Sequence, residues 1–394
     1  MANTIRRIRK SVHKIAVRAG LTSAQAKLSA DIVQGICQTS SCHLSDIARA
    51  LREDERLIVT EQRLSDGLGR PTMDDESVLD AYLSLVAPAA QRMPFVVIDP
   101  TELVKPYGKA FENLDTVRDA SDRRKPLEPG YWTIQIEATN ELNQTLPLLT
   151  QVFSTKAEGY EGWNETFANA AKRVLRAVGN GKIWIFDRAF DGIEWMGICE
   201  TLGVSWLIRQ QQTRHICVAT GATYDMHVFA ASLDRPHGLK IPYVDKKTHE
   251  RKYYEVQFGY VPVRVPALNA DLYLIVVQRP ARDPLVLLTS VRIKTCRQAS
   301  ELVLAYMRRW GVEDAIRFWK QNTGIEDFRV RNWDSIRRLA LFSMIACGLQ
   351  ALLLLTRPSA AQKFMARVKV FIAHVLFQQY RLWAGIQDAL RSGA

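Results

Sequence analysis

The stretch KIWIFD at residues 182–187 decides the fold, because it is a short apolar run that ends in an acid. Such a run is typical of a strand buried within a sheet. Before it, residues 162–178 carry apolar side chains on one helical face, and Gly179-Asn180-Gly181 form an ordinary helix stop. After it come a helical stretch and the strand-like run VSWLIRQ at 204–210. This alternation of strands and helices predicts an α/β layer architecture.

Further strands are predicted on both sides of this region. PFVVID at 94–99 is a second apolar run that ends in an acid, and YWTIQIEAT at 131–139 alternates with period two. Residues 211–295 show no long helical pattern. They contain strand-like runs at 251–265, 271–278 and 284–293, separated by Pro, Asp and Asn. We interpret 211–295 as a β-rich insertion whose last strands return to the main domain.

The N-terminal region, residues 1 to about 75, has helical periodicity and a basic character. Its first 30 residues contain seven Lys and Arg residues and no acid. This pattern predicts a helical DNA-binding domain over 1–75, in which Arg6, Arg7, Arg9 and Lys10 face phosphates. The alternative is a solvated helical cap. A further helix is expected to end near Leu85, before the prolines at 88 and 94, so a second domain is predicted from about residue 90.

Composition and charge restrict the class of protein. The chain has 394 residues, a net charge of +12 and 47% hydrophobic residues, which excludes wholesale disorder and indicates nucleic acid or an anionic membrane as partner. The six cysteines are scattered, which favours a reducing compartment. Cys37, Cys42 and His43 lack the second ligand pair that a zinc site needs. No secretory signal is expected at the N-terminus, and the apolar run at 339–355 is predicted to be a buried core helix.

Three acids stand where chemistry is expected. Asp99 and Asp187 each end an apolar strand, at the rim of the sheet where α/β proteins place ligands and metals, although turn aspartates are also common there. The third, Glu313, shares one predicted helix face with the residues Tyr306, Arg309 and Lys320. Such a face could ligate a metal and hold phosphate oxygens. The alternative is a ladder of ion pairs on an exposed helix.

The spacing Y-x2-R-x3-E-x6-K across residues 306–320 resembles the signature of DDE transposases of bacterial insertion sequences, in the branch named YREK for those letters. The motifs IDPTEL at 98–103 and IFDRAFDG at 185–192 resemble the first and second aspartate strands of that family. The order Asp99, Asp187, Glu313 is the order of the family, and the long gap before Glu313 resembles members with a β-strand insertion.

This resemblance implies a ribonuclease-H-like catalytic core over residues 90–345, with the β-rich insertion at about 211–295 and a helical C-terminal region over 346–394. That last region would serve packing, DNA contact or dimerisation. Asp99, Asp187 and Glu313 would bind two Mg²⁺ ions, for which Mn²⁺ could substitute, because carboxylates suit hard cations. Two such ions would activate the nucleophile and stabilise the leaving oxygen.

The resemblance also implies a set of residues that contact DNA around the transferred end: Tyr306, Arg309, Trp310, Arg317, Lys320 and Arg188. Trp310 could stack on an extruded base or belong to the core. One position departs from the family. Where some members carry a tryptophan before the LLTS strand of the insertion, this chain has Leu285.

The function implied is cut-and-paste transposition through a hairpin intermediate. Its partners would be double-stranded DNA, as terminal inverted repeats and target, and a second copy of the chain in a synaptic complex. A cytoplasmic, nucleoid-associated location in a bacterium and no membrane partner are expected. Two alternatives remain, a catalytically silent DNA-binding derivative and a metal-dependent endonuclease of the same fold.

Overall fold

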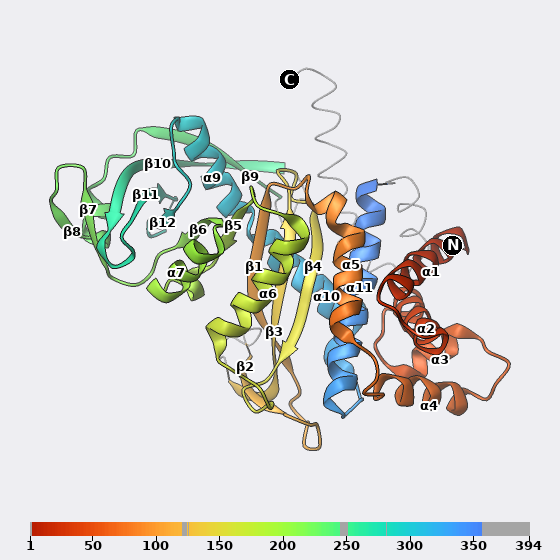
Figure 1. Ribbon diagram of the computed structural model, residues 1–394. Helices are drawn as coiled ribbons and strands as arrows, with labels where there is room; N and C mark the ends of the chain where they lie inside the picture. Colours follow the sequence, from red (N-terminus) through yellow and green to blue (C-terminus); the bar gives the residue numbers. More distant parts are fainter. Residues whose placement is uncertain (1, 120–123, 125, 245–250, 281, 357–394) are drawn as a thin grey trace. The chain divides into compact units, whose positions relative to one another are not determined.

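The computed structural model describes residues 2–119, 124, 126–244, 251–280 and 282–356 (Figure 1). The chain forms two units. Unit 1 consists of Met1–Met93, Asp99–Gly179 and Gly311–Ala394, and unit 2 consists of Pro94–Ile98 and Asn180–Trp310. Strand β1 (Phe95–Val104) and helix α10 (Trp310–Thr323) therefore contribute residues to both units. The end of the predicted C-terminal region, 357–394, lies outside the described residues.

Helices form the N-terminal part of unit 1, as the periodicity of residues 1–75 predicts. Thr22 caps α2, because its hydroxyl accepts from the backbone N–H of Gln25 while the Gln25 side chain accepts from the Thr22 backbone. The remaining helices of unit 1 are α6, the short η3 and α11. The bounds are α1 (Ala2–Arg18), α2 (Ser23–Thr39), α3 (Leu44–Leu51), α4 (Leu57–Leu68), α5 (Asp75–Ala90), α6 (Trp163–Val178), η3 (Ile325–Asp327) and α11 (Trp333–Thr356).

Helix α5 corrects one expectation, because it continues through Pro88 to Ala90 instead of ending near Leu85. Pro88 removes one backbone donor, but it lies in the last turn, where few further helical bonds depend on it. The backbone N–H of Gln91 still donates to the Ala87 carbonyl at 2.8 Å. The local cost of the proline is therefore small enough for packing to extend the helix.

The strands of unit 1 are built around β3 (Leu127–Thr139). It pairs antiparallel with β2 (Asp115–Arg118) and with β4 (Thr145–Phe153), and it neighbours β1 in the strand order. Thr133 ties the second half of β1 to β3, since its hydroxyl donates to the Thr101 carbonyl at 3.0 Å. Strand β1 thus runs on past Asp99 to Val104, whereas the sequence predicts a strand that ends at Asp99. The second half of β1 is stabilised by β3, a neighbour that the local sequence pattern does not reveal.

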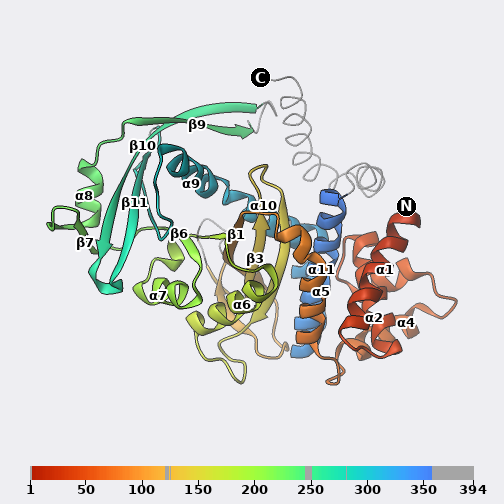
Figure 2. The same cartoon turned by 45° about the horizontal axis from the view of Figure 1, so that its top comes forward.

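Within the described residues, α11 is the one helix whose length and apolar composition would allow it to cross a membrane. The structure buries 14 of its residues between Ser335 and Leu349, and it lies beside α5 (Figures 1 and 2). Gly348 permits this close approach, because a Cβ there would overlap the Tyr82 hydroxyl, which donates to the Pro147 carbonyl at 2.5 Å. The predicted helix at 339–355 is therefore observed in unit 1, where it is buried as far as Leu349 and half-buried from 350 to 355.

Unit 2 combines a parallel and an antiparallel part of a sheet. The first half of β1 pairs parallel with β5 (Ile183–Phe186), and β5 pairs parallel with β6 (Ser205–Arg209). Helix α7 (Ile193–Leu202) connects β5 to β6, as parallel strands require. The predicted mixed α/β class is therefore confirmed. The other short helices are η1 (Arg188–Phe190), α8 (Met226–Ser232) and η2 (Pro266–Leu268), and α9 is Cys296–Arg308.

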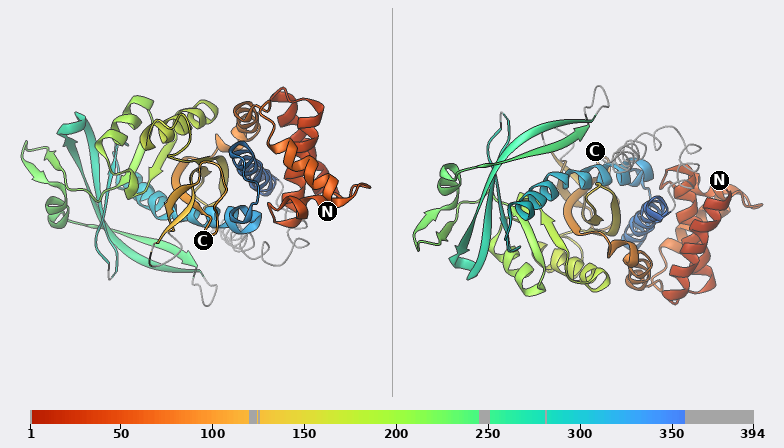
Figure 3. Two further views of the ribbon diagram at one scale, coloured as in Figure 1. Left: turned by 90° about the horizontal axis from the view of Figure 1, so that it is seen from below. Right: turned by 90° about the horizontal axis from the view of Figure 1, so that it is seen from above.

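Residues 211–295 are rich in strands, and the three predicted runs are observed as β10, β11 and β12. β12 returns to pair antiparallel with β6, so the last strand rejoins the parallel part. β9 and β10 form a long curved ribbon (Figures 2 and 3). The bounds are β7 (His215–Val218), β8 (Thr223–Asp225), β9 (His237–Val244), β10 (Arg251–Val265), β11 (Ala270–Gln278) and β12 (Leu285–Thr289).

Candidate active site

Asp187 lies directly after β5, whose apolar side chains are almost all buried. It is followed by η1 and keeps an extended backbone, with φ −76° and ψ 176°. The register of β1 and β5 ends at the pair Ile98 and Phe186, and an aspartate follows each of these residues in the chain. The Asp187 side chain is 25% exposed, so its carboxylate remains accessible.

Two groups from the end of α9 converge on Asp187. The Tyr306 hydroxyl donates to Oδ1 at 3.4 Å, and Nη2 of Arg309 lies 3.9 Å from Oδ2. Burial, with a smaller contribution from the Asp187 charge, raises the pKa of Tyr306 to about 12. At neutral pH the phenol therefore keeps its proton and acts as a neutral donor. Three members of the predicted site, Asp187, Tyr306 and Arg309, are brought together within unit 2.

The four signature residues do not lie on one uninterrupted helix, which corrects the prediction. α9 ends at Arg308 and α10 begins at Trp310, with Arg309 between them. Arg309 keeps helical dihedral angles, and its N–H donates to the Tyr306 carbonyl at 3.1 Å, a tighter turn than an α-helix has. The break precedes Gly311, where a Cβ would lie 2.5 Å from Asn143 Oδ1. Glycine weakens the helix locally and lets the β3–β4 loop approach.

Lys320, the last signature residue, has partners that sequence reasoning missed. Its Nζ lies 3.2 Å from Glu102 Oε1 and 3.1 Å from Glu326 Oε1, all within unit 1. The Lys320 side chain is only 14% exposed and that of Glu102 only 7%. One signal was present in the sequence, because Glu102 lies in the IDPTEL motif, three residues after Asp99. Nothing local pairs it with a lysine 218 residues away.

Asp99 and Glu313 are both half-buried and belong to unit 1, whereas Asp187 belongs to unit 2. Among the described residues, no group of three or more His, Cys, Asp or Glu side chains is gathered closely enough to hold a metal ion. The donor chemistry of the three acids nevertheless fits Mg²⁺ or Mn²⁺, since carboxylate oxygens are the ligands these ions prefer. The Asp187 carboxylate, which is partly exposed, offers oxygens of this type.

Asp191 is a second buried acid of the IFDRAFDG motif, next to the candidate site. Its carboxylate accepts from the backbone N–H groups of Gln211 and Gln212 and from the Arg214 guanidinium. The side chain of Asp191 is fully buried. These bonds tie the chain that follows β6 to the loop that follows Asp187, so Asp191 supports the site from within unit 2.

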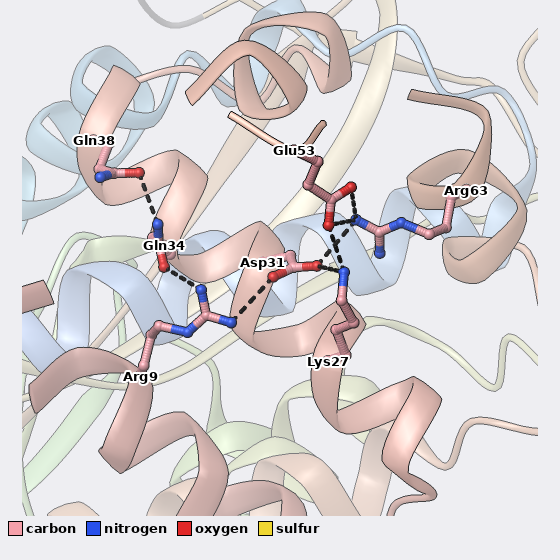
Figure 4. Close-up of polar contacts among 7 residues, drawn as sticks. All are labelled: Arg9, Lys27, Asp31, Gln34, Gln38, Glu53 and Arg63. Carbon is pink, nitrogen blue, oxygen red and sulfur yellow. Dashed lines mark hydrogen bonds and ion pairs between the residues drawn. The ribbon is translucent and has the colours of Figure 1, made fainter. Parts of the chain in front are cut away.

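The four basic residues predicted on α1 fall into two groups. Arg6, Arg7 and Lys10 are exposed and form no ion pair with another described residue. Arg9 instead donates to Gln34 Oε1 at 2.7 Å and pairs with Asp31 at 3.4 Å (Figure 4). The structure therefore separates Arg9 from its neighbours, because it braces α1 against α2.

Figure 4 shows that this brace extends to α4. Asp31, whose side chain is 3% exposed, also pairs with Lys27 and Arg63, each at 3.0 Å. Both cations contact Glu53 as well, at 2.6 Å and 3.0 Å. The hydrogen bond from Lys27 is the largest of several contacts that lower the pKa of Glu53 to about 2. The N-terminal helices are thus held together by a charge network as well as by apolar packing.

The other predicted contact residues are placed as follows. Arg188 is exposed on η1, and Arg317 is exposed on α10, where it pairs with Asp314 at 3.4 Å. The side chain of Trp310 lies outside the part of the chain that the structure describes. Leu285 is 1% exposed and pairs with Val277, so it is a core residue of the sheet.

Cys37 and Cys42, the two cysteines near His43, are both buried. Burial raises the pKa of Cys37 and of Cys42 to about 12, so both thiols keep their protons at neutral pH. Cys37 accepts a contact from the Gln350 amide at 3.4 Å.

Comparison with known proteins gives one family. Residues 142–349, more than half of the 394, match the family described as Transposase DDE domain. The match includes Asp187 and Glu313 and begins after Asp99. No curated protein matches the chain. A cryo-electron microscopy structure of a piggyBac transposase synaptic complex with hairpin DNA is similar, with a TM-score of 0.47 and 12% identity, covering 96% of this chain and 77% of that one.

Proposed function

This chain belongs to the transposase DDE domain family, and on that premise we propose that it moves a bacterial insertion sequence by cutting and joining DNA. The signature Y-x2-R-x3-E-x6-K at 306–320 supports a place in the YREK branch, which is part of the proposal. The proposal includes a ribonuclease-H-like core over residues 90–345, a DNA-binding domain over 1–75 and a C-terminal region over 346–394. The protein would act in the bacterial cytoplasm, as a dimer that holds two element ends.

Asp99, Asp187 and Glu313 are the residues that would hold two Mg²⁺ or Mn²⁺ ions. When bound, such ions activate an attacking oxygen and stabilise a leaving oxygen at phosphorus. The neutral Tyr306 donor and the buried Arg309 orient the Asp187 carboxylate, because a ligating carboxylate needs its remaining lone pairs held in place.

Cut-and-paste movement through a hairpin is the reaction that we propose. Water attacks the phosphodiester at the element end and frees a 3′-hydroxyl, which attacks the opposite strand to form the hairpin and releases the flanking DNA. A second water molecule opens the hairpin. The regenerated 3′-hydroxyl then attacks a phosphodiester of the target DNA and displaces a 3′-hydroxyl of the target strand. Arg188 and Arg317 are exposed and available to phosphates, and Trp310 would stack on an extruded base. With Leu285 in the core, a stacking platform has to come from another aromatic residue.

The observation that carries the proposal is the convergence of Tyr306 and Arg309 on Asp187, at the end of a buried parallel strand. A structural aspartate in an ordinary turn does not require a buried guanidinium and a buried phenol from a helix 119 residues further along the chain. Buried polar groups are costly, so their collection around one partly exposed carboxylate favours a functional site.

The test is strand transfer from a labelled DNA duplex that carries the element end, taken from the DNA that flanks the gene, with Mg²⁺. We expect joined products with the wild type and none with Glu313→Gln. Asp314→Asn is the matched control, because Asp314 is the next residue on α10 and its side chain is 56% exposed.

The two other candidate functions predict different products. Binding without cleavage by the wild type would indicate a catalytically silent derivative of a transposase. Cleavage without joining would indicate a metal-dependent endonuclease of the same fold. Strand transfer that survives Glu313→Gln would contradict the proposed role of the third acid.

A further inference from the structure

Two arginines, Arg279 and Arg282, lie in the segment between β11 and β12, and the proposed reaction does not use them. Arg279 directly follows the last residue of β11 and is half-buried, whereas Arg282 is exposed. We call these two residues the arginine pair. Both belong to unit 2, which also contains Asp187, Tyr306 and Arg309.

The register of the sheet places the arginine pair at the edge where Asp187 stands. β5 and β6 run parallel and are paired as far as Phe186 and Ile208. Asp187 and Arg209 directly follow these two residues, so they stand at the same edge. β12 is antiparallel to β6, and β11 is antiparallel to β12, so β12 begins and β11 ends at this edge. The segment that carries the arginine pair therefore extends from the same edge of the sheet as Asp187.

We propose that Arg279 and Arg282 bind phosphodiester groups of DNA and hold a strand at the edge of the sheet that carries Asp187. This inference rests on the proposed function, which makes DNA the polyanion that reaches this edge. It adds a binding site that lies on the β-rich insertion, outside the signature residues. Element-end DNA and target DNA carry the same phosphodiester group, so the experiment below distinguishes these two sources of the strand.

The charges around the arginine pair are the first argument. Arg209, Arg279 and Arg282 form no ion pair with any acid in the described part of the chain. Burial lowers the pKa of Arg279, and the charges of Arg209 and Arg282 lower it further. Guanidinium groups that repel one another in this way are stabilised when a bound anion compensates their charge. A phosphodiester supplies such an anion.

Hydrogen bonds are the second argument, because they fix the segment but leave donors unused. The Gln278 amide donates to the carbonyls of Arg279 and Arg282, at 3.1 Å and 3.0 Å. Nη2 of Arg279 donates to the Asp283 carbonyl at 3.3 Å. A guanidinium has five N–H donors, and the buried Nε of Arg279 has no hydrogen-bond partner among the described residues. Protein contacts therefore do not use the full bonding capacity of Arg279, whose planar fork matches phosphate oxygens.

Tyr306 connects the arginine pair with Asp187, which is the third argument. Its hydroxyl donates to Asp187 at 3.4 Å. The phenols of Tyr254 and Tyr306 both act on the pKa of Arg279, so both lie near this guanidinium. A phosphodiester bound at the arginine pair would therefore lie close to the phenol that contacts Asp187.

The experiment measures DNA binding in EDTA, so that it does not depend on catalysis. Fluorescence anisotropy gives the affinity for a labelled element-end duplex at several salt concentrations. A second titration adds a labelled duplex of unrelated sequence, as target, to the complex with unlabelled element-end DNA. The variants are Arg279→Gln with Arg282→Gln, and Arg279→Lys with Arg282→Lys. Arg297→Gln is the matched control, because this exposed arginine of unit 2 is already paired with Glu301 at 3.1 Å.

We expect the double glutamine variant to bind at least one of the two duplexes about tenfold more weakly, because it loses charge-assisted hydrogen bonds to phosphate. The slope of log affinity against log salt should fall by about 0.9 for each phosphate contact that is lost. The duplex that responds identifies the source of the strand. The double lysine variant should recover the wild-type slope, because lysine keeps the charge. The control should match the wild type in both titrations.

Two results would overturn the inference. The first is unchanged affinity and slope for both duplexes in the double glutamine variant. The second is a loss of affinity with the wild-type slope, because the arginines would then act through the structure of the segment and not through phosphate. Arg282 is exposed, so Arg282→Gln alone is the test if the double variant does not fold. A wild-type slope in that single variant would also overturn the inference.

Failure of this inference is distinguishable from failure of the proposed function. A wild type that joins DNA, with a glutamine variant that binds both duplexes normally, would lose only the role of the arginine pair. A wild type that binds DNA through the arginine pair but joins none would lose the proposed reaction and keep the binding site.

Discussion

The two ends of the YREK signature are built in opposite ways. At Asp187 one partly exposed acid is contacted by a phenol and a buried cation, whereas at Lys320 one nearly buried cation is contacted by two acids. The first arrangement leaves a carboxylate partly exposed. The second compensates its own charge inside the protein. Residues that belong to one motif in the sequence therefore take part in two different electrostatic arrangements.

The largest effect should come from Asp187→Asn, which keeps the shape of the side chain but removes its charge. We expect cleavage of the element-end duplex to fall at least about 10³-fold, since removing a metal ligand takes away several kcal/mol of transition-state stabilisation. DNA affinity in EDTA should not fall, and gel-shift titration checks this. A cleavage rate for Asp187→Asn within tenfold of the wild-type rate would contradict a catalytic role for Asp187. The comparison between Asp187 and Lys320 would then have no functional meaning.

Glu137 sharpens the contrast with Glu102, because it is a buried acid with no ion pair among the described residues. Burial raises the pKa of Glu137 from 4.5 to about 8, and the Thr145 hydroxyl offsets this only in part. Because the folded-state pKa is raised, the associated stability is present below about pH 4.5 and is lost as the pH rises towards 8. The loss is about 1.4 kcal/mol for each pH unit in that window.

We compare the free energy of unfolding of Glu137→Gln with that of the wild type at two pH values. The difference should shift in favour of Glu137→Gln between pH 4.5 and pH 8. Urea unfolding at a series of pH values measures this change. Glu141→Gln, an exposed position in the loop after β3, is the control and should leave the pH dependence unaltered. Parallel stability curves for the wild type and Glu137→Gln would mean that this acid is already ionised in the folded protein.

Tyr306→Phe is a smaller change in the proposed site around Asp187. It removes the hydroxyl that contacts Asp187 at 3.4 Å but keeps the ring. A cleavage rate about tenfold lower is expected, as for the removal of a group that orients a metal ligand. Because the pKa of Tyr306 is about 12, the shape of the pH–rate profile between pH 6 and 9 should not change. Disappearance of a titration step in that range would show instead that the phenol exchanges its proton during the reaction.

The smallest effect is expected on α1, where exposed basic side chains lie beside one that is held in an ion pair. Arg6→Gln and Lys10→Gln should each weaken DNA binding several-fold and reduce the slope of log affinity against log salt by about 0.9 for every phosphate that the variant no longer neutralises. Arg9→Gln should change that slope less, because Arg9 is engaged with Asp31 and Gln34. Anisotropy titrations at several salt concentrations measure all three. Equal slopes for the three variants would remove the distinction between them.

Much of the fold follows from local pattern. The apolar run at 182–187 is β5, the amphipathic stretch at 162–178 is α6, and the strands within 211–295 lie where alternation and turn residues place them. These predictions succeed because a short apolar run, a helical period of 3.6 and a turn residue are all properties of neighbouring residues. Exceptions arise where packing against another segment determines where an element ends. One example is α5, which continues through Pro88 to Ala90.

The sequence by itself determined the family, the order of the three acids and the spacing of the signature, because these are properties of one chain read in one direction. Only the tertiary structure decided that β1 continues past Asp99, that the signature helix breaks at Arg309, and that Lys320 pairs with Glu102. In each case the cause is a contact between residues distant in sequence, or the burial of a charge. Such contacts depend on how the elements pack, which no local pattern encodes.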